Sequence, residues 1–106
     1  MSEIKKLLGR RIKELRTSCN ITQEKLSELT DIGASSLSKI ESGYFHPTDD
    51  NLEKIAKALN VEPFQLYMFN HLRSAEELKS DLHNIIDNSD ENQIKLIYKI
   101  INSILY

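Results

Sequence analysis

Very little in this chain interrupts a helix. Its 106 residues include only three Gly, two Pro and one Val, and apolar and polar residues almost never alternate at period two. Leu and Ile instead recur three and four residues apart along most of the chain, which is the spacing of one helical face. The spacing therefore predicts an all-α protein.

The apolar spacing divides the first 69 residues into five helices. Local signals mark several of their ends: Thr22 is a good N-cap, Gly43 is a typical stop, and Pro63 suits a first turn. We expect helices over about Ser2 to Cys19, from the cap Thr22 to the link at Thr30, from Gly33 to Gly43, from Thr48 or Asp49 through Leu59, and from Glu62 to Phe69. In this prediction Leu26 and Leu29 are the apolar positions of the second helix.

The pattern changes after residue 70. Ser74 is placed to cap a helix through Ile86, the polar run Asp87–Asn92 predicts a turn, and a last helix follows over about Asp90 to Leu105. That last helix has more apolar positions than a one-sided stripe needs. We therefore predict two domains, 1–70 and 71–106, the second a helical hairpin for dimerisation. Its expected interface residues are Ile94, Leu96, Ile97, Ile100, Ile101, Ile104 and Leu105.

Two other uses of this hairpin stay open. It can cap the core of a monomer, or it can bind a different protein.

The segment from Thr22 to Gly43 carries the main functional signal. Two short helices are joined there by the tight link Thr30–Gly33, and the outward face of the second of them is small, polar and uncharged or basic. The residues of that face are Ser35, Ser36, Ser38, Lys39 and Ser42. A face without carboxylates can approach a phosphate-lined groove, and Ser and Lys side chains can hydrogen-bond to base edges. A plain solvated face is the alternative interpretation.

The residues ITQEKLSELTDIGASSLSKIESG resemble the helix-turn-helix of the lambda Cro/CI-type regulators, also called the XRE family. The following stretch NLEKIAKALNVEPFQLY is similar to the family's fourth and fifth helices, so the resemblance covers about residues 6–69. It implies a five-helix lambda-repressor-like DNA-binding domain. Its third helix is expected to enter the major groove while the second lies across the backbone.

The resemblance also implies roles for single residues. The residues that it implies contact the bases are Ala34, Ser35, Ser36 and Lys39. Phosphate contacts fall to Arg16, Gln23, Ser38, Tyr44 and His46. Arg16 is further expected to form a structural ion pair with Glu41, and Asp31 stands where the family usually has Gly, so we expect Asp31 to bear any positive φ in the link.

The resulting hypothesis is a sequence-specific DNA-binding transcriptional regulator. We expect it to act as a repressor and to bind an inverted-repeat operator in double-stranded DNA as a homodimer, with a protein antagonist as a further partner. The alternative is an antitoxin or repressor-antagonist interaction module on the same fold. No catalytic, metal-ligating or phosphate-loop pattern occurs, so we expect neither enzymatic activity nor a cofactor or metal.

The charges are distributed unevenly along the chain. The whole has 14 Lys and Arg against 16 Asp and Glu, but residues 1–25 have seven against three and residues 49–106 have six against ten. The basic end suits phosphates and the acidic part does not. A single Cys, no apolar signal core and no long apolar run lead us to expect a cytoplasmic protein with no membrane partner.

Overall fold

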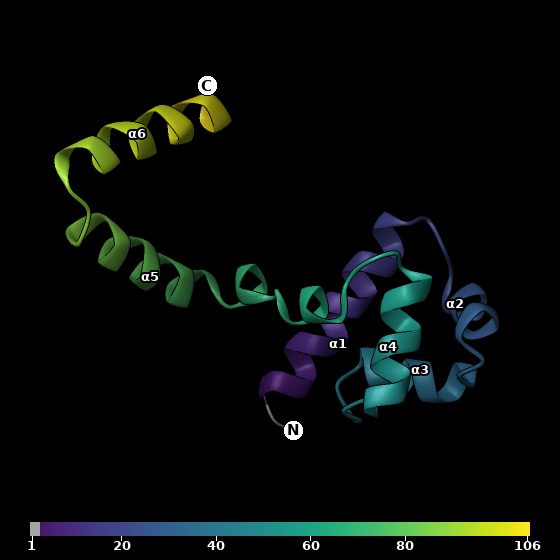
Figure 1. Cartoon of the computed structure of the whole chain (residues 1–106). Coiled ribbons are helices and arrows are strands. Elements are labelled where there is room, and N and C mark those ends of the chain that lie inside the picture. The colour runs from purple at the N-terminus through teal and green to yellow at the C-terminus, as the bar shows by residue number, and fades with distance from the viewer. Residues whose placement is uncertain (1–2) are drawn as a thin grey trace. The chain divides into compact units, whose positions relative to one another are not determined.

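All regular secondary structure in the computed structural model, which describes residues 3–106, is helical (Figure 1). The α-helices are Glu3–Ser18 (α1), Gln23–Thr30 (α2), Ala34–Glu41 (α3), Asp49–Ala58 (α4), Ala75–Asp87 (α5) and Glu91–Leu105 (α6). Two 3₁₀ helices, Pro63–Tyr67 (η1) and Asn70–Leu72 (η2), lie between α4 and α5 in the chain. The all-α prediction is confirmed. The fifth expected helix is the 3₁₀ helix η1, and the expected start of the first helix at Ser2 lies outside the described residues.

The chain divides into two compact units. The first extends to Arg73 and contains α1 to η2, and the second is Ser74–Tyr106, with α5 and α6. The division falls three residues beyond the end of the predicted 1–70 segment.

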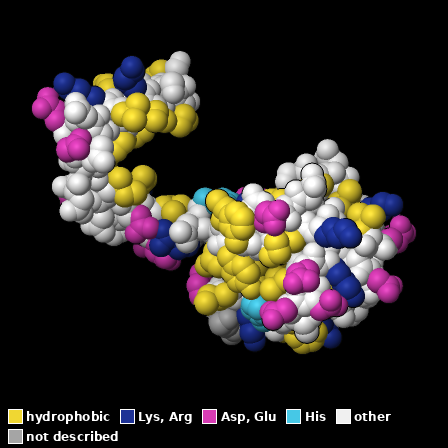
Figure 2. All heavy atoms as spheres, viewed as in Figure 1, with side chains coloured by type: hydrophobic (Ala, Val, Ile, Leu, Met, Phe, Trp, Pro, Cys, Tyr) yellow, Lys and Arg dark blue, Asp and Glu magenta, His cyan; other side chains and the backbone are white. Residues whose placement is uncertain are grey.

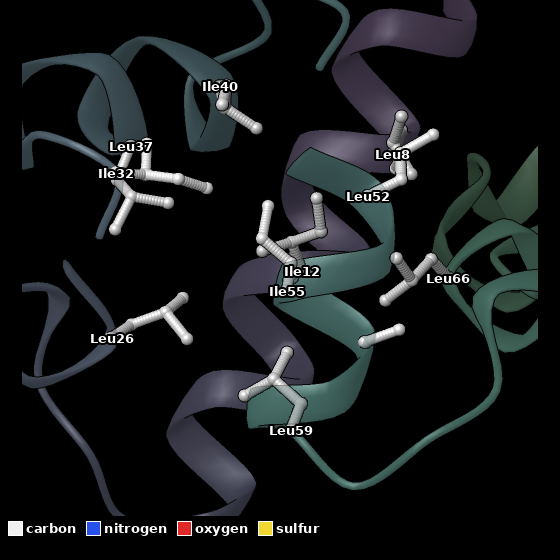
Figure 3. Close-up of a cluster of buried hydrophobic side chains, with 11 residues drawn as sticks. Leu8, Ile12, Leu26, Ile32, Leu37, Ile40, Leu52, Ile55, Leu59 and Leu66 are labelled. Atoms are coloured by element: carbon white, nitrogen blue, oxygen red, sulfur yellow. The ribbon is translucent and has the colours of Figure 1, made fainter. Parts of the chain in front are cut away.

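Every helix from α1 to α4, together with η1, contributes to one core in the first unit. Figure 3 shows side chains from these elements converging on a common centre. The largest fully buried residues are Leu8, Ile12, Leu26, Leu37, Ile55 and Leu66. Each such side chain contributes about 1.5–3 kcal/mol through removal from water. The two short helices α2 and α3 are therefore held in place by α1 and α4, because neither buries enough surface alone.

Leu29, a predicted apolar position of the second helix, lies outside this core with 52% of its surface exposed. The helix α2 has only eight residues, and its buried positions are Leu26 and Thr30, one turn apart. Leu29 is about 100° away from Thr30 around the helix axis and so faces outward. The polar Thr30 occupies the inner site, where its Oγ1 donates to the Leu26 carbonyl oxygen at 2.7 Å.

Basic side chains of α1 fasten the segment that contains η1 and η2. Arg11 Nε donates to the Gln65 carbonyl oxygen at 3.1 Å, and an Arg10 terminal nitrogen donates to the Leu72 carbonyl oxygen at 3.0 Å. Glu14 lies 2.9 Å from His71 Nε2 and 2.6 Å from Arg11. Charged groups of α1 thus add to the apolar packing of Leu66 in holding the end of the first unit against its first helix.

The second unit consists of two well-capped helices with no buried residue in either of them. The Ser74 hydroxyl accepts from the Glu77 N–H at 3.2 Å at the start of α5. Asp90 and Gln93 form a reciprocal capping box at the start of α6, with bonds of 2.8 and 2.9 Å. Local signals therefore define the ends of both helices, but packing within the unit leaves their apolar faces open.

Candidate nucleic-acid interface

The link between α2 and α3 is a tight turn with local hydrogen bonds. Asp31 has φ 58° and ψ 25°, the left-handed conformation, so the positive φ expected at this position is present. The Ile32 N–H donates to the Thr30 hydroxyl at 3.3 Å, and the Ser27 hydroxyl donates to the Ile32 carbonyl oxygen. Ile32 itself is buried in the core. Such a link fixes the angle between the two helices.

The helix α3 presents two chemically different faces. Leu37 and Ile40 are buried, with 0% and 3% of their surface exposed. The four residues that the resemblance assigns to base reading are all exposed, as is Ser38. They are Ala34, Ser35, Ser36 and Lys39. The single carboxylate of α3, Glu41, is buried, so the outer face of this helix has no negative side chain.

Glu41 is the centre of a buried polar cluster at the end of α3. Its carboxylate accepts from Arg16 Nε at 2.8 Å and from the second guanidinium branch at 3.0 Å, and the Gln23 amide donates to it at 3.0 Å. The third guanidinium nitrogen of Arg16 donates to the Ile21 carbonyl oxygen at 2.8 Å. The cluster therefore joins α1, the start of α2 and the end of α3.

This cluster bears on the expected phosphate contacts. Arg16 is 8% exposed and each of its three side-chain nitrogens already donates one hydrogen bond within the protein, which favours a positioning role over direct contact with phosphate. Gln23 is half-buried at the first residue of α2, where the helix N–H groups can receive an anion. The bidentate geometry that joins Arg16 to Glu41 is the strongest form of such a pair.

The segment that follows α3 turns back on the helix. The Tyr44 N–H donates to the Lys39 carbonyl oxygen at 2.9 Å, and the Gly43 N–H donates to the Ile40 carbonyl oxygen at 3.1 Å, which is the Schellman pattern. Gly43 has φ 86°, and a Cβ on it would lie 3.0 Å from the Lys6 Cα. Glycine is needed there for both its conformation and its small size.

Two further residues with expected phosphate roles lie in this loop. Tyr44 is 64% exposed. His46 is also exposed, but its ring nitrogens lie 2.8 Å from the Pro47 carbonyl oxygen and 3.1 Å from the Tyr67 hydroxyl. Burial raises the pKa of the Tyr67 phenol, and the nearby Asp49 charge adds to the effect. Tyr67 thus stays a neutral hydroxyl that can donate to His46.

Gly9 positions this surface but has no functional signature in the sequence. A Cβ built on Gly9 would lie 2.4 Å from the Ile40 carbonyl oxygen and 2.6 Å from that of Glu41. The backbones of α1 and α3 therefore touch at this point. Among 16 helical residues a lone Gly reads only as a weak helix former, and nothing local in the sequence reveals its partner.

The residues assigned to a dimer interface lie on α6, where they are half-buried or exposed. Ile94 and Ile97 are half-buried, whereas Ile104 is 75% exposed. The others, all exposed, are Leu96, Ile100, Ile101 and Leu105. An open apolar groove of about 220 Å³ lies between α5 and α6, lined by Ile86, Ile94, Ile97, Tyr98 and Ile101. Figure 2 shows hydrophobic side chains gathered on α6 and on the adjoining side of α5.

Other kinds of site find little support. Within residues 3–106, no three His, Cys, Asp or Glu side chains gather in a way that could hold a metal ion. None of the helices described is both long and apolar enough to cross a membrane.

The same segments are similar to known regulators. Residues 12–66, just over half of the chain, match the family model described as helix-turn-helix. The control protein C.BamHI of Bacillus amyloliquefaciens is 37% identical over 79 residues, which are 74% of this chain and 98% of that protein. The HTH-type transcriptional regulator ImmR of Bacillus subtilis is 31% identical over 88 residues, which are 83% of this chain and 68% of that protein.

A solved structure adds the spatial match. The crystal structure of the restriction-modification controller protein C.AhdI from Aeromonas hydrophila has a TM-score of 0.57 and 34% identity, and the match covers 57% of this chain and 92% of that one. The three similar proteins are named as control or regulatory proteins, and none is named as an enzyme.

Proposed function

The chain belongs to the XRE-type helix-turn-helix family of transcription regulators, and on that premise we propose that it binds a specific DNA operator through the outer face of α3. The observation that carries this proposal is the composition of that face. Ala34, Ser35, Ser36 and Lys39 are exposed together, and the only carboxylate of the helix is turned into the protein. Such a surface can enter the major groove without repelling phosphates.

In this proposal the base readers have distinct tasks. The Ala34 methyl group contacts a thymine methyl, the Ser35 and Ser36 hydroxyls donate to or accept from base edges, and Lys39 donates to guanine acceptors. Three small side chains make few direct base contacts. A larger share of the discrimination therefore comes from the shape and deformability of the DNA.

Phosphate contacts hold the protein in register on the duplex. We assign them to the first turn of α2 with Gln23, to Ser38, and to Tyr44 and His46 in the loop after α3. Arg16 acts with Glu41 by fixing Gln23 and the end of α3, since each of its three side-chain nitrogens already donates a hydrogen bond within the protein.

The C-terminal helices supply the homodimer. Helices α5 and α6 bury no residue by themselves, and α6 exposes Ile100, Ile104 and Leu105 by 51, 75 and 66%. Apolar surface of this extent on a pair of helices marks an interaction site. A second copy of the chain, packing the same residues of α6, buries it and gives the two-fold symmetry that an inverted repeat requires.

The regulatory outcome we propose is repression, by steric exclusion of polymerase from the operator, in the cytoplasm where the DNA lies. No step of it requires catalysis or a cofactor. The open groove between α5 and α6 also suits a different protein, so an antitoxin or a repressor antagonist is the second candidate function.

One selection and one sizing measurement test these proposals together. The purified protein is used to enrich binding sites from random duplex DNA, and its mass in solution is measured by light scattering. The expected result is an inverted repeat with half-sites about 34 Å apart, bound by a dimer. A dimer that enriches no sequence contradicts operator binding, whereas a monomer favours the second candidate function.

A further inference from the structure

The ammonium group of Lys39 lies over an aromatic ring. Its Nζ is 5.4 Å from the centroid of the Phe45 ring, within the range of a cation–π contact. Among the described residues, Lys39 makes no ion pair with a carboxylate. Phe45 is 48% exposed, so the ring covers the lysine without entering the core.

Backbone hydrogen bonds after α3 fix the position of the Phe45 ring. Gly43 reverses the chain in the left-handed conformation, and both the Tyr44 and Phe45 N–H groups then point to the Lys39 carbonyl oxygen, at 2.9 and 3.4 Å. The far end of the loop is held by His46 against Tyr67 at 3.1 Å. The Phe45 ring is therefore held beside Lys39, the residue whose carbonyl oxygen accepts both of these hydrogen bonds.

We infer that Phe45 is a positioning residue that sets the sequence specificity of Lys39. This inference rests on the proposed function of α3. A free lysine side chain samples many rotamers and can reach phosphate as easily as a base. The Phe45 ring restricts the ammonium to one side while leaving N–H groups free to donate to guanine O6 and N7.

An aromatic partner suits this place better than an acidic one. Asp or Glu would also hold the lysine, but it would neutralise the charge and bring a carboxylate close to the phosphates. The quadrupole of the ring attracts the cation without adding a negative charge. The inference thus explains why an apolar ring lies exposed beside a polar reading helix.

The test is the ratio of dissociation constants for a scrambled duplex and for the selected operator, at one salt concentration. Phe45→Ala is expected to reduce this ratio about two- to fivefold, the size of an exposed cation–π contact. Phe45→Tyr, which keeps the ring, should retain the wild-type ratio. Phe45→Leu, which keeps an apolar side chain without the π face, should behave as Phe45→Ala.

A double-mutant cycle separates positioning from direct DNA contact. In a Lys39→Ala background, Phe45→Ala should change the ratio no further, because the group that it positions is gone. Phe64→Ala, which removes another exposed aromatic ring from η1, is the matched control and should leave the ratio unchanged.

Three results would overturn the inference: a Phe45→Ala ratio equal to wild type, a Phe45→Leu ratio equal to wild type, or an undiminished effect of Phe45→Ala without Lys39. Each of these results is meaningful only when the wild-type protein binds its operator more tightly than the scrambled duplex. A wild type that shows no discrimination would instead contradict the proposed function itself. Circular dichroism of each variant checks that the fold is kept, and Phe45→Leu keeps the test valid if Phe45→Ala unfolds.

Discussion

Gly9 and Ile40 mark the point where α1 and α3 touch backbone to backbone, because a Cβ on Gly9 would lie 2.4 Å from the Ile40 carbonyl oxygen. Gly9→Ala is therefore expected to lower the free energy of unfolding by about 3 kcal/mol, as overpacking does. It should also weaken DNA binding, since α3 must move outward. Urea unfolding measures the first effect, and operator titration measures the second.

Gly33→Ala is the matched control, because nothing lies within 4 Å of a Cβ at that position. Its φ of −57° suits alanine, but Gly33 is the N-cap of α3, where alanine is less favourable, so we expect a loss of about 0.5–1 kcal/mol, well below that of Gly9→Ala. Alanine is the better helix former by about 1 kcal/mol, so a clash-free Gly9 site would be stabilised by the substitution. A more stable Gly9→Ala variant would refute the close contact.

The buried Arg16–Glu41 pair predicts a strong asymmetry between single and double substitutions. Arg16→Met should lower the free energy of unfolding by about 3–5 kcal/mol, because it leaves the Glu41 carboxylate buried with the Gln23 amide as its one remaining partner. The double variant Arg16→Met with Glu41→Leu should lower the free energy of unfolding by less than Arg16→Met, since it leaves no unpaired charge in the interior. Chemical denaturation of the three proteins gives the comparison.

The exposed pair Lys54–Asp50, at 3.1 Å on α4, provides the reference for an ordinary surface contact. Lys54→Ala should cost no more than about 0.5 kcal/mol. An Arg16→Met cost as small as this would mean that the buried cluster does not hold α1 and α3 together.

Glu14 gives the first unit a predictable response to acid. Partial burial pushes the pKa of Glu14 up, but hydrogen bonds from Arg11 and His71 and their charges outweigh it and hold the pKa below its ordinary value of 4.5. A lowered folded-state pKa stabilises the fold above 4.5, and the contribution is lost as the pH falls through the folded-state pKa. Since the Glu14 side chain is 37% exposed, we expect its ionised form to contribute less than about 1 kcal/mol to the free energy of unfolding.

Glu14→Gln should therefore destabilise the protein more at pH 7 than at about pH 3, because the stabilisation from the native carboxylate fades as the pH falls below 4.5. Unfolding in urea at both pH values tests this difference. Glu53→Gln, at an exposed position on α4, is the control for loss of a surface carboxylate and should change the free energy of unfolding by less than about 0.5 kcal/mol at pH 7. An equal loss at both pH values would mean that Glu14 acts through packing alone.

Self-association through α6 predicts that a charge on its apolar face dissociates the protein. Ile104→Glu, at a position 75% exposed, should shift the mass in light scattering from dimer to monomer without unfolding the first unit. Ser80→Glu adds the same charge to α5 two residues from both Leu78 and Leu82, on the opposite side of that helix. It should remain dimeric, and equal masses for both variants would argue against the interface.

Periodicity and capping residues were sufficient to predict the all-α class and the positions of α1 to α4. Thr22 and Ser74 cap helices through their side chains as expected, Thr48 rather than Asp49 caps α4, and Asp90, in the polar run expected to form a turn, caps α6. The spacing does not distinguish Leu26, which is buried, from Leu29, which is 52% exposed, because the eight-residue helix α2 buries only two positions, Leu26 and Thr30. Which residues of a short helix are buried depends on the neighbouring helices that cover it, and the local spacing of apolar residues does not determine this.

The features of the first unit that the sequence did not predict depend on long-range contacts. The close approach at Gly9 joins residues about thirty positions apart, and the Arg10 and Arg11 contacts to the Leu72 and Gln65 carbonyls join residues 62 and 54 positions apart. Arg16 shows the same limit in part: its pair with Glu41 was expected, whereas its burial and its hydrogen bond to the Ile21 carbonyl oxygen were not.

The central claim is that the outer face of α3 reads base pairs, and the ratio of non-specific to specific dissociation constants tests it most directly. Measured at one salt concentration for the selected operator and a scrambled duplex, Lys39→Ala should reduce this ratio by about tenfold or more. Gln23→Ala should instead weaken binding to both duplexes by similar factors. An unchanged ratio in Lys39→Ala would contradict the assignment of α3 as the reading helix.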